Sequence, residues 1–179
     1  SICPGCSSGC NIRVDVFEGS IRRLKPRANL EVNQYWMCDE GRFGWREIQR
    51  HERLVEPCSG SGDDEKAVSW DLALDAARQG LSQAGEGGDE LAVVLNGNLT
   101  NEETYLLLRL ARDEWHAGLI CMDDGKYGQE RVFKSGFTIR ADRTPNRRGV
   151  REIAKGLGID LGSTEMLGTR LRNGELKRA

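Results

Sequence analysis

The stretch Ser1–Cys10, SICPGCSSGC, contains three cysteines within eight residues, and a fourth cysteine follows after a gap of 27 residues. Three close thiolates and one remote thiolate suit an iron–sulfur cluster, in which each iron takes a ligand from a different direction. The proline and two glycines of the stretch allow the tight turning that such a loop requires. The predicted cluster ligands are Cys3, Cys6, Cys10 and Cys38.

Three other uses of these cysteines compete with a cluster. A structural zinc site also takes four thiolates, but usually as two short C-x₂₋₄-C pairs, and Cys38 has no near partner. A disulfide framework is typical of small secreted chains, whereas this chain has 179 residues, six cysteines and no apolar signal segment. Buried structural thiols would not gather in one short loop. Cys58, in a Gly/Ser-rich stretch, and Cys121, in an apolar run, are not expected to be ligands.

Charge and hydropathy limit the class of partner. The 26 basic and 28 acidic residues give a net charge of −2, so nothing indicates a nucleic-acid-binding surface. No apolar stretch approaches the roughly 20 residues of a membrane helix, and no direct membrane insertion is expected. Unpaired thiols and an oxygen-sensitive cluster suit a reduced cytosolic setting. No pattern of a catalytic triad or of paired catalytic carboxylates is visible.

Residues 1–57 are expected to form a small β-rich module around the cysteines. Residues 12–26 alternate apolar and polar side chains around a Gly-containing turn, which predicts a β-hairpin that lets Cys38 return to the first three cysteines. Residues 41–54 predict a short helix or an irregular arm. The polar Gly/Ser-rich stretch 58–66 is expected to be a linker.

Residues 67–179 are expected to form an incomplete α/β domain with a parallel sheet. The apolar runs Leu91–Leu95 and Leu119–Met122 predict buried parallel strands. Between them, the capping box Thr100-x-x-Glu103 predicts a helix to about Trp115, which completes a right-handed β-α-β unit. The expected buried side of this helix consists of Leu106, Leu107, Leu110 and Ala111.

Further elements are expected on both sides of this unit. Ser69 predicts the start of a helix that ends within Gly85–Gly88, with an apolar face formed by Trp70, Ala73, Leu74, Ala77 and Leu81. A strand is expected at Phe137–Arg140 and a helix at Arg147–Leu157, but no closing strand after Leu161. An open sheet of two or three strands has exposed edges, so a larger parent domain is expected.

The cysteine pattern and the motif VNxxWxCDxGRFG at residues 32–44 resemble the iron–sulfur module of the molybdopterin oxidoreductase superfamily. Within it they resemble in particular the large peripheral G-type subunits of NADH:quinone oxidoreductase. Further matches follow in order at residues 53–57, 68–74, 99–105 and 144–149. The resemblance implies a [4Fe-4S] cluster and electron transfer within an NADH dehydrogenase complex. It also implies other peripheral-arm subunits as partners and a cytoplasmic position, held at the inner face of the cell membrane through those partners.

Two features depart from the family pattern. The chain starts two residues before Cys3, so an internal piece of a longer subunit is expected, not catalytic by itself. Catalytic members carry Lys two residues after the fourth cysteine, between cluster and pterin, where this chain has Glu40 beside Asp39. Because two carboxylates would repel an anionic pterin, no molybdopterin is expected. Two alternatives stay open: a molybdo- or tungstopterin oxidoreductase such as a formate dehydrogenase large subunit, and a zinc-stapled scaffold domain without redox activity.

Overall fold

The computed structural model describes residues 1–85, 91–123, 125 and 127–176. The chain folds as two compact units, each assembled from separate stretches of sequence. The first unit contains Ser1–His51, Asn96–Asn101 and Asp123–Ile153, and the second contains Glu52–Leu95, Glu102–Met122 and Ala154–Ala179. This division differs from the expected one, because two later stretches belong with the cysteines. The fold class, a small β-rich part followed by a parallel α/β sheet, is confirmed.

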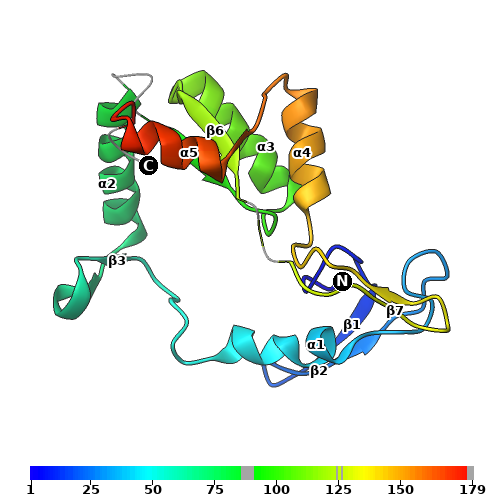
Figure 1. Ribbon diagram of the computed structural model, residues 1–179. Helices are drawn as coiled ribbons and strands as arrows, with labels where there is room; N and C mark the ends of the chain where they lie inside the picture. The colour runs from blue at the N-terminus through cyan, green and yellow to red at the C-terminus, as the bar shows by residue number, and fades with distance from the viewer. Residues whose placement is uncertain (86–90, 124, 126, 177–179) are drawn as a thin grey trace. The chain divides into compact units, whose positions relative to one another are not determined.

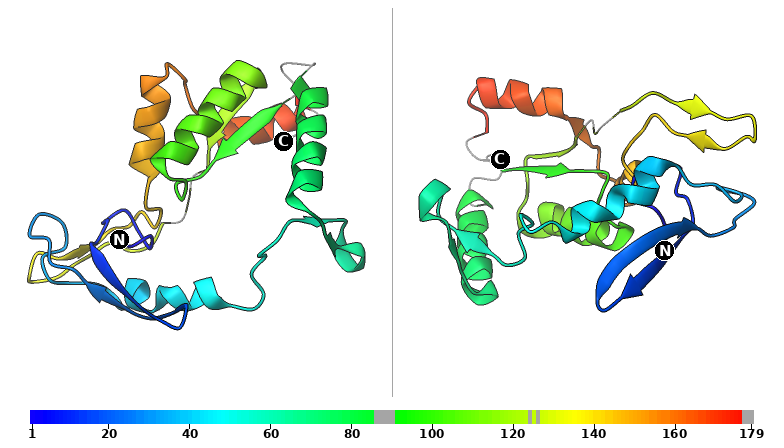
Figure 2. Two further views of the ribbon diagram at one scale, coloured as in Figure 1. Left: turned by 180° about the vertical axis from the view of Figure 1, so that it is seen from behind. Right: turned by 90° about the horizontal axis from the view of Figure 1, so that it is seen from below.

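Two antiparallel hairpins build the first unit, drawn as dark blue and yellow arrows in Figure 2. The predicted hairpin consists of β1 (Ile12–Phe17) and β2 (Ser20–Pro26), and Gly19 turns between them with φ 74°. A short helix α1 (Asp39–Phe43) and a 3₁₀ helix η1 (Gly44–Gln49) form the expected arm. The second hairpin pairs β7 (Arg131–Val132) with β8 (Thr138–Ile139), of which only the latter half was predicted.

The core of the first unit is small and rich in sulfur. Its apolar side chains come from both hairpins and from the segment that precedes α1. Its buried members are Cys3, Cys10, Ile12, Leu24, Met37, Phe137 and Ile139. The cysteines are therefore part of the packed interior and not of a surface loop.

The second unit contains a parallel sheet in the order β5-β6-β9, of which Figure 1 labels the central strand, β6. As predicted, β5 (Ala92–Leu95) and β6 (Leu119–Met122) pair in parallel, and α3 (Asn101–Arg109) with its π-helical continuation η3 (Leu110–Glu114) connects them. The helix α5 (Thr164–Arg172) contacts β6.

The expectation of no strand after Leu161 is wrong. Strand β9 (Gly162–Ser163) pairs in parallel with β6. A Cβ atom at Gly162 would lie 2.8 Å from Leu119 Cδ1, so the absent side chain lets the two strands approach. A strand of two residues without an apolar run has no periodicity to detect.

The predicted buried side of α3 is only partly correct. Ala111 is buried as expected, but Leu106 and Leu110 are exposed, and the other buried residues are Thr104 and Leu108. Positions 104, 108 and 111 recur at helical spacing. Three consecutive leucines at 106–108 cannot all face one side, so composition alone did not identify the buried one.

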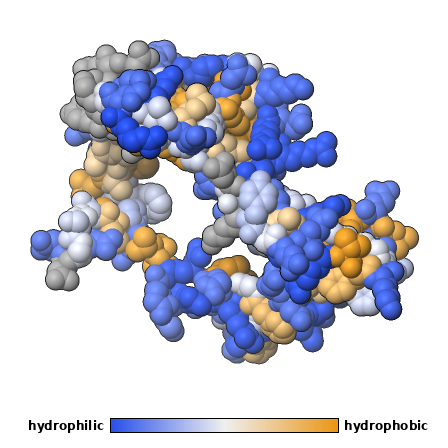
Figure 3. Space-filling model, in the orientation of Figure 1, coloured by the Kyte–Doolittle hydropathy of each residue, from blue (hydrophilic) through white to orange (hydrophobic). Residues whose placement is uncertain are grey.

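The helix α2 (Trp70–Gly85) forms as predicted, and the Leu72 N–H donates to the capping Ser69 Oγ at 3.3 Å. Of its predicted apolar face, Trp70 (66%), Leu74 (60%) and Ala77 are exposed, and Ala73 and Leu81 are half-buried. Figure 3 shows hydrophobic side chains at the surface over this helix. Periodicity identifies a face suited to burial but not whether another element covers it. The predicted end of the helix extends into residues 86–88, outside the described residues.

The remaining segments are short. The expected linker 58–66 contains β3 (Cys58–Ser59) and the 3₁₀ turn η2 (Gly62–Asp64), and β3 pairs with β4 (Lys66–Ala67). The predicted helix near residue 147 is α4 (Arg147–Gly156), followed by Gly158 at φ 68°. In the part of the chain that the structure describes, no helix has the length and apolar character to cross a membrane.

Candidate metal centre

Backbone pairing closes the loop that carries the first three cysteines. The Cys3 N–H donates to the Cys10 carbonyl at 2.8 Å, and Ile2 pairs with Asn11 in an antiparallel bridge. Gly9 adopts φ 63°, a conformation in which a side chain would be strained. The loop turns its sulfurs inward, and the exposed fractions are 6% for Cys3, 7% for Cys6 and 5% for Cys10.

A buried amide holds the segment that delivers the fourth cysteine. Asn33 is 1% exposed, its Oδ1 accepts from the Asn11 N–H at 3.0 Å, and its Nδ2 donates to the Trp36 carbonyl at 3.0 Å. These bonds connect the end of the cysteine loop to the residues just before Cys38. Asn33 lies in the quoted motif, but its structural role was not predicted.

Gly41 separates two of the sulfurs. Cys38 caps α1, and its Sγ accepts from the Gly41 N–H at 3.4 Å. A Cβ atom at position 41 would lie 2.9 Å from Cys3 Sγ and 3.6 Å from Cys38 Sγ. Any side chain at this position would crowd Cys3, whereas the distance to Cys38 is an ordinary contact, so Gly41 leaves room beside the first predicted ligand.

The four thiols are close enough to affect one another. Burial raises the pKa of Cys3, and the charges of Cys38 and Cys6 raise it further against a lowering hydrogen bond from Gly5. Burial, followed by the charges of Cys3, Cys6 and Cys38, raises the pKa of Cys10 to about 11. Thiols with raised pKa values stay protonated at neutral pH, so metal binding must release protons here.

The donor set and its surroundings fit an iron–sulfur cluster. Among the described residues, no three His, Cys, Asp or Glu side chains converge on the position of a single metal ion. A cubane takes one thiolate at each iron and does not need such convergence. The four cysteines would supply its thiolates, and the apolar side chains that pack with Cys3, Cys10 and Cys38 would surround it.

A distant segment contacts the cysteine loop, which sequence reasoning missed. The Ser7 N–H donates to the Asp142 carbonyl at 3.0 Å, and Ser8 Oγ donates to the Thr138 carbonyl at 3.0 Å. Phe137 and Ile139 of the same segment belong to the core of the thiols. Hydrogen bonds between residues 130 positions apart leave no signal in local patterns.

The side chain of Asp142 is anchored in turn. Its Oδ2 accepts from Arg147 Nε at 3.0 Å, and its Oδ1 accepts from the Thr144 N–H at 2.9 Å. Burial alone would raise the pKa of Asp142, but the bonds from Thr144 and the charge of Arg147 outweigh burial and lower it. The carboxylate is therefore charged at neutral pH and fixes the backbone that receives Ser7.

Glu40 is paired with two arginines. Its Oε2 accepts from Arg143 Nη1 at 2.9 Å, and its Oε1 accepts from Arg131 Nη2 at 3.3 Å. Both arginines come from the distant segment that contacts the cysteine loop. The charge of Glu40 is thus compensated in part, which the spacing of charges along the sequence does not reveal.

The other two cysteines belong to the second unit. Cys58 is exposed in β3, and Cys121 is fully buried in β6. Burial by itself raises the pKa of Cys121, with no contribution from another thiol. The ligand set remains the prediction made from the spacing.

Residues 1–50 match the family described as the molybdopterin oxidoreductase Fe4S4 domain. The chain is 39% identical over 114 residues to the G subunit of NADH-quinone oxidoreductase from Streptomyces coelicolor, covering 63% of this chain and 13% of that protein. It is 46% identical over 79 residues to the G subunit of the Pseudomonas fluorescens enzyme, covering 44% and 8%. A Staphylococcus haemolyticus protein, named as a formate dehydrogenase, is 30% identical over 114 residues, covering 63% and 12%.

The matched region therefore spans only a small fraction of each relative's length. All three relatives carry the names of oxidoreductases or of their subunits. The matched domain, the mixed fold and the buried thiols agree with the resemblance seen in the sequence. The match to the molybdopterin oxidoreductase Fe4S4 domain thus covers residues 1–50, and these residues include all four predicted ligands.

Proposed function

We propose that this chain transfers electrons through one [4Fe-4S] cluster held by four thiolates, as part of an NADH:quinone oxidoreductase complex. The proposed ligands are Cys3, Cys6, Cys10 and Cys38. The observation that carries the proposal is that Cys3, Cys10 and Cys38 share one apolar core, where burial, followed by the charges of neighbouring thiols, raises the pKa of Cys10. The Fe4S4 domain match supports the type of cluster.

The chain's own residues would bind, shield and tune the cluster. When bound, the cluster supplies one-electron transfer at iron. The buried side chains of Ile12, Leu24 and Phe137 keep water from the thiolates. The N–H groups of Gly5 and Gly41 point at sulfurs, and such hydrogen bonds shift a cluster's potential.

The proposed partners are the other peripheral-arm subunits of the complex, which would deliver electrons from NADH. The proposed location is the cytoplasm, at the inner face of the cell membrane, where those partners hold the chain. Support comes from the two relatives named as G subunits of NADH-quinone oxidoreductase.

A pterin-dependent oxidoreductase is the second candidate, because one relative is named as a formate dehydrogenase. We place it second because Glu40 stands where catalytic relatives carry a lysine. Its carboxylate also accepts hydrogen bonds from Arg131 and Arg143, so these two cations are already paired and less able to bind an anionic pterin. We also propose that the intact protein carries neither molybdenum nor tungsten.

The test is an electron paramagnetic resonance measurement on the intact native protein in its complex, reduced anaerobically with NADH or with formate. The proposal predicts a cluster signal that NADH elicits, that formate does not, and that Cys38→Ala removes. Elemental analysis should find iron without stoichiometric molybdenum or tungsten. Molybdenum together with formate-dependent reduction would establish the pterin enzyme instead, and zinc without sulfide would establish the scaffold.

A further inference from the structure

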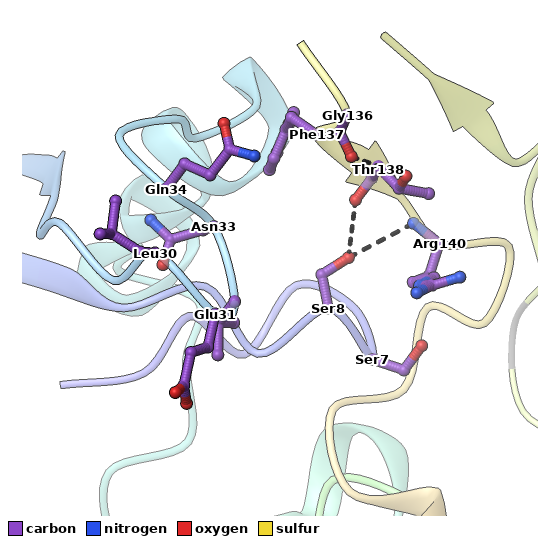
Figure 4. A pocket seen from close by; sticks show the side chains of 11 residues that line it. Ser7, Ser8, Leu30, Glu31, Asn33, Gln34, Gly136, Phe137, Thr138 and Arg140 are labelled. Carbon is purple, nitrogen blue, oxygen red and sulfur yellow. Dashed lines mark hydrogen bonds between the residues drawn. The ribbon is translucent and has the colours of Figure 1, made fainter.

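The hydroxyl of Ser8 joins the cysteine loop to a strand 130 residues away in sequence. Ser8 Oγ donates to the Thr138 carbonyl at 3.0 Å and accepts from the Arg140 N–H at 3.4 Å. Figure 4 shows both bonds as dashed lines, with Ser8 reaching toward the strand. A single side chain thus satisfies one acceptor and one donor at the edge of β8, as a neighbouring strand would.

Two further contacts attach the same segment. The Ser7 N–H donates to the Asp142 carbonyl at 3.0 Å. Glu40, two residues after the fourth predicted ligand, pairs with Arg143 at 2.9 Å. The segment 138–143 is therefore attached beside the second and the fourth predicted ligands, and Ser8 adds an attachment between Cys6 and Cys10.

Ser8 also borders a polar cavity of about 370 Å³, lined by the cysteine loop, residues 30–34 and residues 136–140. Figure 4 shows Ser7, Ser8 and Arg140 on one side of this cavity, facing Asn33 and Gln34. No cysteine is among its lining residues in the described chain. The bonded Ser8 thus lies at the edge of a polar cavity and, in sequence, two residues from both Cys6 and Cys10.

We propose that Ser8 is a positioning residue that sets the potential and the stability of the cluster by holding segment 138–140 against the cysteine loop. The inference rests on the proposed function, because it requires a cluster at the four cysteines. A cluster's potential depends on solvent exposure and on hydrogen bonds around its sulfurs. Water that enters after loss of the contact would stabilise the more negative, reduced cluster and raise the potential.

The experiment compares three variants of the full chain with the cluster bound. Ser8→Ala removes the hydroxyl without changing charge, and Ser8→Thr retains a hydroxyl. Ser7→Ala is the matched control, because Ser7 contacts the segment through its backbone N–H. The readouts are the midpoint potential, the rate of iron release to a chelator, and amide hydrogen exchange at Arg140.

Ser8→Ala should raise the midpoint potential and release iron faster than the wild type. Loss of two neutral hydrogen bonds should speed exchange at the Arg140 amide by roughly tenfold. Ser7→Ala and Ser8→Thr should behave as the wild type.

Equal potentials and release rates in Ser8→Ala and Ser7→Ala would overturn the inference and leave the cluster assignment intact. Equal shifts in Ser8→Ala and Ser8→Thr would overturn the role of the hydroxyl. A wild-type chain that binds no iron and sulfide would overturn the proposed function first.

Discussion

The two units of this chain bury cysteine in different ways. In the first unit, Cys3 and Cys10 share their core with few apolar side chains, and the charges of neighbouring thiols contribute to the raised pKa of Cys10. In the second unit, Cys121 is a single thiol within an apolar strand and interacts with no other thiol. We expect the core around Cys3 and Cys10 to be stabilised by the metal that the thiols bind, whereas the strand around Cys121 is stabilised by side-chain packing.

The largest expected effect separates the ligand cysteines from the others. Cys38→Ala should abolish or convert the cluster, because a cubane then lacks one of its four thiolates. Cys58→Ser should leave the visible spectrum unchanged, since this thiol is exposed in β3. An intact cluster in Cys38→Ala together with its loss in Cys58→Ser would disprove the ligand assignment.

Removal of the cluster should loosen only the first unit. Where metal binding is coupled to folding, loss of the metal unfolds the part that it organises. Limited proteolysis of the metal-free chain should therefore cut first within residues 11–51, while the segment from Glu102 to Met122 of the second unit resists. Early cleavage inside that segment would show that the second unit is not the independently stable one.

A substitution in the core of the second unit should destabilise that unit and leave the cluster unchanged. Leu108 has an exposed fraction of 0%, so Leu108→Ala leaves a cavity and should lower the free energy of unfolding by roughly 2–5 kcal/mol. Denaturant titration followed by circular dichroism measures this change. The cluster spectrum in native buffer should stay the same, and its loss would show that the two units are not separable.

The metal-free first unit should lose stability at high pH. The pKa of Cys10 is raised from 9.0 to about 11, so the folded unit favours the protonated thiol. This contribution is fully present below pH 9 and disappears as the pH rises toward 11. Denaturant titrations at several pH values, with Cys10→Ser as the control, measure it. A stability independent of pH in this window would mean that the thiols are not packed together.

The smallest expected effect lies on α2. Leu74 was predicted to face a core, but it is 60% exposed, so Leu74→Gln should change the free energy of unfolding by less than about 0.5 kcal/mol. Leu108→Ala is the matched control in the same unit. A loss as large as that of the control would show that this face is covered in solution.

Local patterns predicted the elements with strong signals. The alternation at residues 12–26 predicted β1 and β2, and two apolar runs predicted β5 and β6. Ser69 marked the beginning of α2. These elements depend on residues that are close in sequence, so local patterns of residue types are enough to predict them.

Contacts between distant segments could not be predicted in this way. The pairing of β9 depends on Gly162 lying against Leu119, and the segment 138–143 reaches the cysteine loop across 130 residues. Glu40 was singled out for its charge, but its arginine partners arrive from positions 131 and 143. Sequence spacing thus predicted the four thiols and missed the residues that hold them in place.

The most direct test is the composition and spectrum of the chain purified without oxygen. We expect a broad brown absorption in the visible range, with iron and acid-labile sulfide in equal amounts, both lost in Cys38→Ala. Stoichiometric zinc with no sulfide and no visible absorption would contradict the assignment of an iron–sulfur cluster.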